Sequence, residues 1–225
     1  MTRAWGDNQL SKTGFENSNQ VPAPGMSPFL YNRAARLLVT RPLTWLYGIE
    51  VTGSGNWPQA GRPALIASNH GSNFDPVLLG LAFPGIIRWM AKAELWKVPG
   101  LGWLISRLGA FPVRRGEADR EAIREARALL REGQIVGMFP EGTRQRGGSL
   151  GEPQPGAGML AMEPGITVVP VRIRGSEGII RRGLPRRPKI SVTVGPPIDL
   201  EIAGMSRGKA YREASRRIMA AIAEL

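Results

Sequence analysis

A histidine and an aspartate separated by four residues are the first candidates for chemistry in this sequence. The segment Asn69-His70-Gly71-Ser72-Asn73-Phe74-Asp75 follows the short apolar run 64–68, and an apolar helical run begins at Pro76. It therefore joins a strand to a helix, at the edge of an α/β sheet where ligands usually bind. Across such a turn Asp75 can fold back and accept a hydrogen bond from one ring nitrogen of His70. The other nitrogen is then free to take a proton, so the pair could act as a general base and its orienting carboxylate.

The same residues also allow a structural interpretation. Asp75 directly precedes Pro76, which is an ordinary arrangement for a helix N-cap, and a single histidine in a turn is often structural. From this segment alone, both catalysis and helix capping remain open.

Three further segments lie on or after predicted strands. Phe139-Pro140-Glu141-Gly142-Thr143-Arg144 follows a buried strand: Gly142 permits a tight turn, Arg144 offers a fork of donors for a phosphate, and Glu141 can support the arginine or contact a substrate hydroxyl. The stretch 109–116 runs from a strand into Arg114 and Arg115. Taken alone, the segment 139–144 is also typical of a polar turn, and the stretch 109–116 is also typical of a solvated strand end. Val169-Pro170-Val171 places a proline in an apolar strand, which predicts a sheet edge or a bulge.

Strands and helices that could position these segments alternate along the chain. Strands are expected at 48–53, 64–68, 86–90, 110–113, 135–139, 166–173 and 190–194. Helices are expected after Asp75, after Pro99-Gly100, at 117–132 and at 207–223. The stripe that includes Ala122, Ile123 and Ala126 makes 117–132 the clearest helix. This alternation predicts an α/β fold with a mixed central sheet flanked by helices.

The sequence divides into three parts. Residues 1–26 are polar and predict a mobile tail, and residues 48–225 form the main domain. Residues 27–47 predict an N-terminal amphipathic helical segment that either packs on the core or lies at a membrane interface. No apolar run reaches the roughly 20 residues that a spanning helix needs, and the N-terminus lacks the apolar core of a signal peptide. We expect a cytoplasmic protein that can lie on a membrane.

Composition narrows the chemistry further. The 225 residues include 30 Lys+Arg and 18 Asp+Glu, which give a formal net charge of +12, together with one histidine and no cysteine. The lack of cysteine excludes a disulfide framework, a thiolate nucleophile and a cysteine-based zinc site. Any imidazole chemistry must therefore occur at His70. The positive charge indicates a phosphate-bearing partner such as nucleic acid, anionic lipid or a nucleotide-like cofactor.

In their order, these four segments resemble the glycerolipid acyltransferase family, whose typical member makes phosphatidic acid from 1-acylglycerol-3-phosphate. The first family block is matched by Asn69, His70 and Asp75, and the second by 109–115. The third is matched at all six positions of 139–144, and the fourth at 169–171. The resemblance covers roughly residues 48–200 and makes 48–225 the expected acyltransferase domain.

The resemblance implies an O-acyltransferase in phospholipid biosynthesis. The donor would be an acyl thioester, either acyl-CoA or acyl carrier protein, and the acceptor would be lysophosphatidic acid. His70 would deprotonate the glycerol hydroxyl, and Asp75 would orient His70. The residues expected to bind substrate are Asn69, Lys92, Arg115, Glu141, Gly142, Thr143 and Arg144. No metal, no further cofactor and no nucleic acid are expected, and the protein would associate peripherally with an anionic, cytoplasmic membrane face.

Two departures from the family pattern and two alternatives remain. Arg114 stands where many members carry Asp and could share the phosphate with Arg115, and the N-terminal region lacks the long apolar anchor of many relatives.

One alternative function is the same chemistry on glycerol-3-phosphate, another lysophospholipid or an amino lipid. The other is a non-catalytic basic protein that binds membrane or nucleic acid, favoured by the basic run 181–189 but without a nucleic-acid-binding motif.

Overall fold

A computed structural model describes residues 48–225 except 60, 108, 114–117, 146, 182–183 and 186–187. The predicted tail (1–26) and the predicted amphipathic segment (27–47) lie outside the described residues. So do Arg115 and three arginines of the basic run 181–189, namely Arg182, Arg186 and Arg187. Among the helices that are described, none is both long enough and apolar enough to cross a bilayer.

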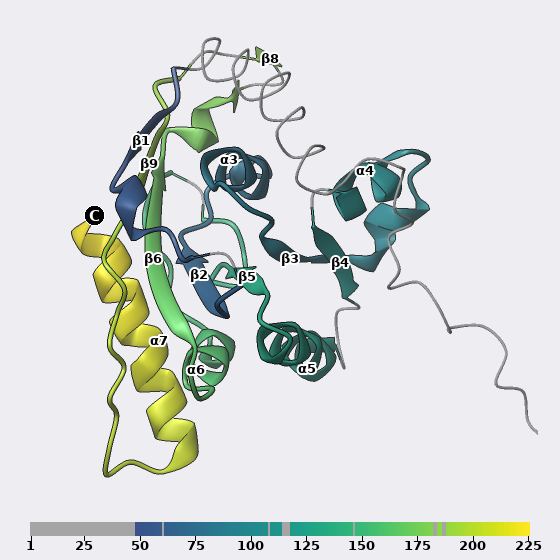
Figure 1. Cartoon of the computed structure of the whole chain (residues 1–225). Coiled ribbons are helices and arrows are strands. Elements are labelled where there is room, and N and C mark those ends of the chain that lie inside the picture. The colour runs from purple at the N-terminus through teal and green to yellow at the C-terminus, as the bar shows by residue number, and fades with distance from the viewer. Residues whose placement is uncertain are drawn as a thin grey trace, which may run out of the picture.

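A seven-stranded sheet organises the domain (Figure 1). Its spatial order is β1 (Glu50–Thr52), β9 (Ser191–Val194), β6 (Thr167–Arg174), β2 (Ala64–Ser68), β5 (Ile135–Met138), β3 (Arg88–Lys92) and β4 (Ala110–Val113). The five strands from β6 to β4 run parallel, whereas β9 pairs antiparallel with β6 and parallel with β1. The mixed central sheet expected from the sequence is confirmed.

The middle of the sheet is formed by short apolar runs that are covered on both faces. All five residues of β2 are buried, and so are the first three of β5. Continuous apolar runs of this kind are typical of parallel strands that have helices on both sides. The carboxyl ends of β2 and β5 therefore meet at one edge of the sheet, and the segments that carry the candidate residues leave from there.

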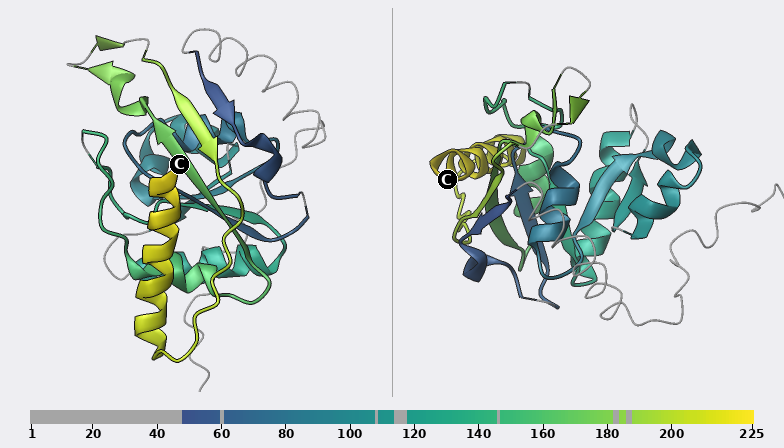
Figure 2. Two further views of the ribbon diagram at one scale, coloured as in Figure 1. Left: turned by 90° about the vertical axis from the view of Figure 1, so that its left-hand side faces the viewer. Right: turned by 90° about the horizontal axis from the view of Figure 1, so that it is seen from above.

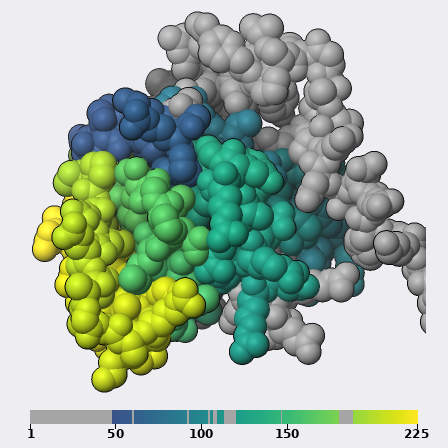
Figure 3. Space-filling model, turned by 60° about the horizontal axis from the view of Figure 1, so that its bottom comes forward, coloured from purple at the N-terminus to yellow at the C-terminus, as the bar shows by residue number. Residues whose placement is uncertain are grey.

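Helices cover the two faces of the sheet (Figures 1 and 2). On one face α3 (Asp75–Ala82) contributes Leu78 and Leu79 to the core cluster that also contains Val169 and Val171 of β6. The other face is covered by α5 (Ala118–Arg131), α6 (Pro155–Ala161) and α7 (Arg207–Glu224). Figure 3 shows the segments of these three helices side by side, coloured teal, green and yellow. Four residues of the predicted stripe of α5 are buried in this second core cluster: Ile123, Ala126, Leu129 and Leu130.

Shorter elements lie at the edges of the sheet. The 3-10 turn η2 (Ser54–Asn56) follows β1, and η3 (Ala93–Lys97) with α4 (Leu101–Arg107) connects β3 to β4. After β6 come η4 (Ser176–Gly178) and the two-stranded ribbon of β7 (Ile180–Arg181) and β8 (Leu184–Pro185). This ribbon projects beyond the seven-stranded sheet (Figure 2).

Two elements, β3 and α6, differ from the sequence prediction. β3 spans Arg88–Lys92 rather than 86–90, and α6 was not predicted. Helix α6 has seven residues and is rich in Gly and Ala, so it shows no helical apolar stripe; instead, Gly158 lets its backbone approach the Tyr211 carbonyl of α7.

The expectation that Pro170 marks a sheet edge is wrong. β6 lies between β9 and β2, and Pro170 pairs with Ala67 of β2. The Pro170 carbonyl accepts a hydrogen bond from Gly195 N (2.9 Å), so the position that lacks an N–H faces the β9 side. Because β9 ends at Val194, the missing donor is tolerated inside the sheet.

Candidate active site

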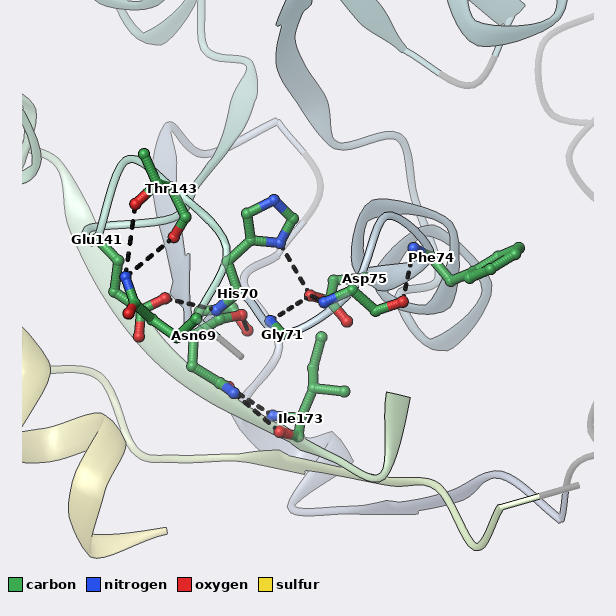
Figure 4. Close-up of polar contacts among 11 residues, drawn as sticks. Asn69, His70, Gly71, Phe74, Asp75, Glu141, Thr143 and Ile173 are labelled. Carbon is green, nitrogen blue, oxygen red and sulfur yellow. Dashed lines mark hydrogen bonds and ion pairs between the residues drawn. The ribbon is translucent and has the colours of Figure 1, made fainter. Parts of the chain in front are cut away.

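His70 and Asp75 meet across the turn from β2 to α3 (Figure 4). His70 Nδ1 lies 2.9 Å from Asp75 Oδ2. The Asp75 side chain is completely buried, whereas the His70 side chain is 17% exposed. The second ring nitrogen of His70 points away from Asp75 (Figure 4). The structure thus brings together the two residues that the sequence proposed as a base and its orienting carboxylate.

Asp75 Oδ2 accepts three hydrogen bonds at once. Besides His70 Nδ1, the backbone N–H groups of Gly71 (2.8 Å) and Ser72 (2.7 Å) donate to it. An ionised carboxylate can only accept, so Nδ1 must carry the proton that it donates. The lone pair of the neutral ring therefore resides on Nε2, which is the nitrogen that points away from Asp75.

The helix-capping interpretation of Asp75 is not supported. Asp75 is the first residue of α3, its N-cap is Phe74, and no side chain caps the helix by a hydrogen bond. The carboxylate instead folds back onto residues 70–72. Its structural contribution is to hold the preceding loop.

The backbone of His70 is held on both sides by the segment after β5. Glu141 Oε2 accepts a hydrogen bond from His70 N (2.8 Å), and Gln145 N donates to His70 O (2.7 Å). Glu141 Oε1 accepts from Gly151 N (3.0 Å), so one carboxylate joins the His70 turn to the loop 145–151. Both carboxylate oxygens of Glu141 are engaged, and the residue is only 3% exposed. We therefore interpret Glu141 as a positioning residue rather than a contact for a substrate hydroxyl.

Burial also changes the proton affinity of Glu141. It raises the pKa of this carboxyl above its ordinary value, and the N–H groups of Gly151 and His70 oppose that rise. His70 therefore lies near two buried carboxylates, those of Asp75 and Glu141. A positive charge that develops on the imidazole would be stabilised by both.

Aromatic stacking fixes the plane of the imidazole. The His70 ring stacks on Phe139 with centroids 4.0 Å apart and planes 13° apart. Phe139 in turn stacks on Trp89 of β3 at 5.0 Å and 15°. Trp89 is 4% exposed and belongs to the core. The ring therefore has both a fixed hydrogen-bond partner and a fixed face.

Asn69 has a structural position beside the histidine. Its Nδ2 donates to Ile173 O (2.9 Å), and its Oδ1 accepts from Ile173 N (2.8 Å). The amide thereby fastens the end of β2 to β6. Because both ends of the amide are engaged with backbone, we interpret Asn69 as a further positioning residue.

The candidate phosphate ligands lie at the surface or outside the described residues. Gly142, Thr143 and Arg144 are exposed in the turn after β5, and Gly142 has φ +67°, which explains the glycine there. Lys92 ends β3, but its side chain is not described, and Arg115 lies outside the described residues. Among the described residues, no three carboxylate or imidazole side chains converge on a potential metal site.

Sequence reasoning missed the groups that organise this site through their backbone. The donors at Gly71, Ser72, Gln145 and Gly151 are N–H groups, so residue type does not reveal them. The only sequence signal for this organisation was the spacing of four residues between His70 and Asp75, which allows the turn to close. The side chains of Arg172 and Arg174, which line a cavity near this loop, were also not singled out.

The fold and the site define an α/β protein with a histidine–aspartate pair at the carboxyl edge of its sheet. The model of the acyltransferase family matches residues 48–174. The chain belongs to this family, as its sequence motifs predicted.

Individual relatives agree. The chain is 31% identical over 159 residues to a chloroplastic 1-acyl-sn-glycerol-3-phosphate acyltransferase of Arabidopsis thaliana, covering 66% of this chain but 44% of the relative. It is 34% identical over 155 residues to a lyso-ornithine lipid O-acyltransferase of Pseudomonas aeruginosa, covering 68% of this chain and 58% of the relative. The chain therefore spans about half the length of these curated relatives.

The fold also matches a solved relative. The crystal structure of the 1-acyl-sn-glycerophosphate (LPA) acyltransferase PlsC from Thermotoga maritima superposes with a TM-score of 0.66 and 28% sequence identity. The match covers 88% of this chain and 80% of that one.

Proposed function

We propose that this protein transfers a fatty acyl chain from an acyl thioester to the free glycerol hydroxyl of 1-acylglycerol-3-phosphate, giving phosphatidic acid. The observation that carries the proposal is the buried Asp75 carboxylate bonded to His70 Nδ1, which leaves Nε2 as a base. The names of the Arabidopsis and Thermotoga relatives support this acceptor.

In the proposed reaction His70 is the general base. Nε2 takes the proton of the acceptor hydroxyl while the hydroxyl oxygen attacks the thioester carbonyl. The C–S bond of the tetrahedral intermediate then breaks, and the thiolate leaving group recovers the proton from the imidazolium. Asp75 keeps the ring in the required tautomer and stabilises the imidazolium without being protonated itself.

The remaining roles follow from charge. The acceptor phosphate carries close to two negative charges at neutral pH, and we assign it to Arg144, Lys92 and Arg115. The donor is acyl-CoA or acyl carrier protein, and the transfer needs no metal or further cofactor. Lipid substrates and a net charge of +12 support peripheral attachment to an anionic membrane.

Thiol release from palmitoyl-CoA in the presence of lysophosphatidic acid tests the proposal. Because the chain contains no cysteine, a thiol reagent meets no background from the protein. We expect release that depends on the acceptor and a product that is phosphatidic acid by mass. Release that is independent of lysophosphatidic acid contradicts the proposal.

The Pseudomonas relative favours a second candidate acceptor, a lyso-amino lipid. The same assay with lyso-ornithine lipid, and with glycerol-3-phosphate as a third acceptor, ranks them by kcat/KM. If kcat/KM is higher with lyso-ornithine lipid or glycerol-3-phosphate than with lysophosphatidic acid, that compound is the acceptor, and the role of His70 is unchanged.

A further inference from the structure

A cavity of about 200 Å³ lies next to the active-site loop, on the side of β6. Asn69 and Gly71, the neighbours of His70 in sequence, form part of its wall. The rest of the wall comes from the loop after β5, from the end of β6 and from η4. The polar side chains among these are Gln145, Ser149, Arg172, Arg174 and Glu177.

Two arginines on β6 give this cavity its positive charge. Arg172 is anchored, since its Nη1 donates to the carbonyls of Ile222 (3.2 Å) and Ala223 (2.7 Å) near the end of α7. Its Nε is buried and has no hydrogen-bond partner among the described residues. Arg174 lies two residues further along, on the same face of β6, and is exposed. Burial and the nearby charge of Arg174 both lower the pKa of Arg172. An anion between the two guanidinium groups would relieve this repulsion.

Glu177 limits the net charge of the wall. A Cβ added to Gly71 would lie 3.7 Å from Glu177 Oε2, and one added to Gly148 would lie 3.6 Å from Oε1. The carboxylate therefore lies between the two loops that border the cavity. Two arginines and one glutamate leave one positive charge, which matches an anion with a single charge, such as a phosphodiester, better than a phosphomonoester.

The order of the strands separates this cavity from Lys92, one of the proposed acceptor ligands. The His70 ring stacks towards Phe139 and Trp89, on the side of β5 and β3. Lys92 ends β3, so this assigned ligand belongs to that side, whereas Arg144 follows β5 and directly precedes Gln145 of the cavity wall. β6 lies on the opposite side of β2. Two substrates that meet at His70 can approach from these opposite sides.

We propose that the cavity binds the phosphate-bearing arm of the acyl thioester donor, with Arg174 as the accessible cation. This inference rests on the proposed function, because it needs a thioester donor. Both candidate donors carry phosphopantetheine, which has a singly charged phosphodiester in a carrier protein and continues into a pyrophosphate in CoA. One site could therefore recognise the arm of either donor.

The test compares Arg174→Gln, Arg174→Lys and Arg62→Gln, an exposed arginine that precedes β2 at the opposite edge of the sheet. Arg174→Gln should raise KM for palmitoyl-CoA roughly tenfold or more. KM for the acceptor and the melting temperature should not change. Arg174→Lys should recover part of the loss, and Arg62→Gln should behave as wild type. A rise in KM for the acceptor alone, or no rise at all, overturns the proposal.

A donor without phosphate sharpens the result. With palmitoyl-N-acetylcysteamine, wild type and Arg174→Gln should have equal kcat/KM, because no phosphate remains for Arg174 to bind. An equal loss with both donors would instead mean that Arg174 acts on the fold or the chemistry, and the proposal fails.

Binding of CoA measured by calorimetry separates this inference from the proposed function. If wild type binds CoA, Arg174→Gln binds it at least tenfold more weakly, and no lysophosphatidic acid is acylated, the function fails and the subsite stands. If wild type turns over palmitoyl-CoA and Arg174→Gln binds CoA equally well, the subsite fails and the function stands. If neither protein binds CoA, the subsite fails regardless of turnover.

Discussion

Three N–H donors converge on a single oxygen of Asp75, and this defines the chemistry at the residue scale. The imidazole cannot rotate without breaking its bond to that oxygen and its stack on Phe139. Preorganisation of this kind places Nε2 before the substrate arrives, so that little rearrangement is needed during proton transfer.

Replacing His70 by Ala should abolish acyl transfer in a folded protein. The chain has no other imidazole, and loss of a general base typically lowers the rate about 10²–10⁴-fold. The measurement is kcat together with the melting temperature. If the folded variant retains more than about a tenth of the wild-type rate, His70 is not the base.

Asp75→Asn should lower kcat by about 10²-fold or more while acceptor KM stays the same. Asn can still accept the N–H groups of Gly71 and Ser72, but it lacks the charge that stabilises an imidazolium. Steady-state kinetics and thermal unfolding separate the two effects. A stable variant with wild-type kcat would mean that Asp75 serves only to hold the loop.

At the scale of elements, the segment after β5 positions the histidine through Glu141. Since the pKa of Glu141 is raised in the folded state, the folded protein binds that proton more tightly than the unfolded chain does. The stability from this group is therefore present below its ordinary pKa of 4.5 and is lost as the pH rises through the raised folded value.

Glu141→Gln removes this titration. The free energy of unfolding of wild type relative to the variant should therefore fall as the pH rises from about 4.5 into the raised range. Urea unfolding at several pH values measures it. The variant should also lose activity, because its amide nitrogen cannot accept a second N–H group. A difference in stability that does not change with pH contradicts the assignment.

Gly137 of β5 leaves room for the rings of Phe139 and Trp89 that stack beneath His70. A Cβ on Gly137 would overlap the ring of Trp89 and the side chain of Ile87. Gly137→Ala should therefore destabilise the protein by about 1–3 kcal/mol and lower kcat by displacing Trp89 and Phe139. Gly80→Ala is the matched control, since a Cβ there meets open space. Equal stability of the two variants would show that the stack adapts freely.

The sequence predicted the elements that follow strong patterns. Buried strands such as 64–68 and the striped helix, predicted at 117–132 and found at Ala118–Arg131, were identified because apolar spacing determines them. α6 was missed because it is held by tertiary contacts, in which the Ser215 hydroxyl donates to Gln154 O and accepts from Gly158 N. Pro170 was wrongly predicted to lie at a sheet edge. It is tolerated inside the sheet because the neighbouring strand β9 ends at Val194, and the residues around Pro170 do not reveal where β9 ends.

The candidate site was predictable only in part. The pairing of His70 with Asp75 was foreseen from residue types and spacing. The positions of Glu141 and Asn69 were not, because each depends on a backbone partner that is distant in sequence, His70 and Ile173 respectively.

At the scale of the whole molecule, the charge of +12 predicts reversible binding to anionic membranes. A basic residue near an anionic surface contributes about 1 kcal/mol, and salt screens exposed charges. The full chain should co-sediment with anionic vesicles at low salt, much less at high salt, and weakly with neutral vesicles. Lack of binding to anionic vesicles at low salt would contradict surface attachment.

The loop held by Asp75 has a consequence for how its sequence can vary. Its two backbone donors belong to positions 71 and 72, the Ser72 hydroxyl accepts a long hydrogen bond from Phe74 N (3.3 Å), and the side chains of Asn73 and Phe74 are exposed. Gly71 itself has room for a methyl group, whose nearest neighbour would be 3.6 Å away. What the turn requires is a fixed number of peptide units. Positions 71, 73 and 74 can therefore accept other residues, whereas a single insertion or deletion would separate His70 from its carboxylate.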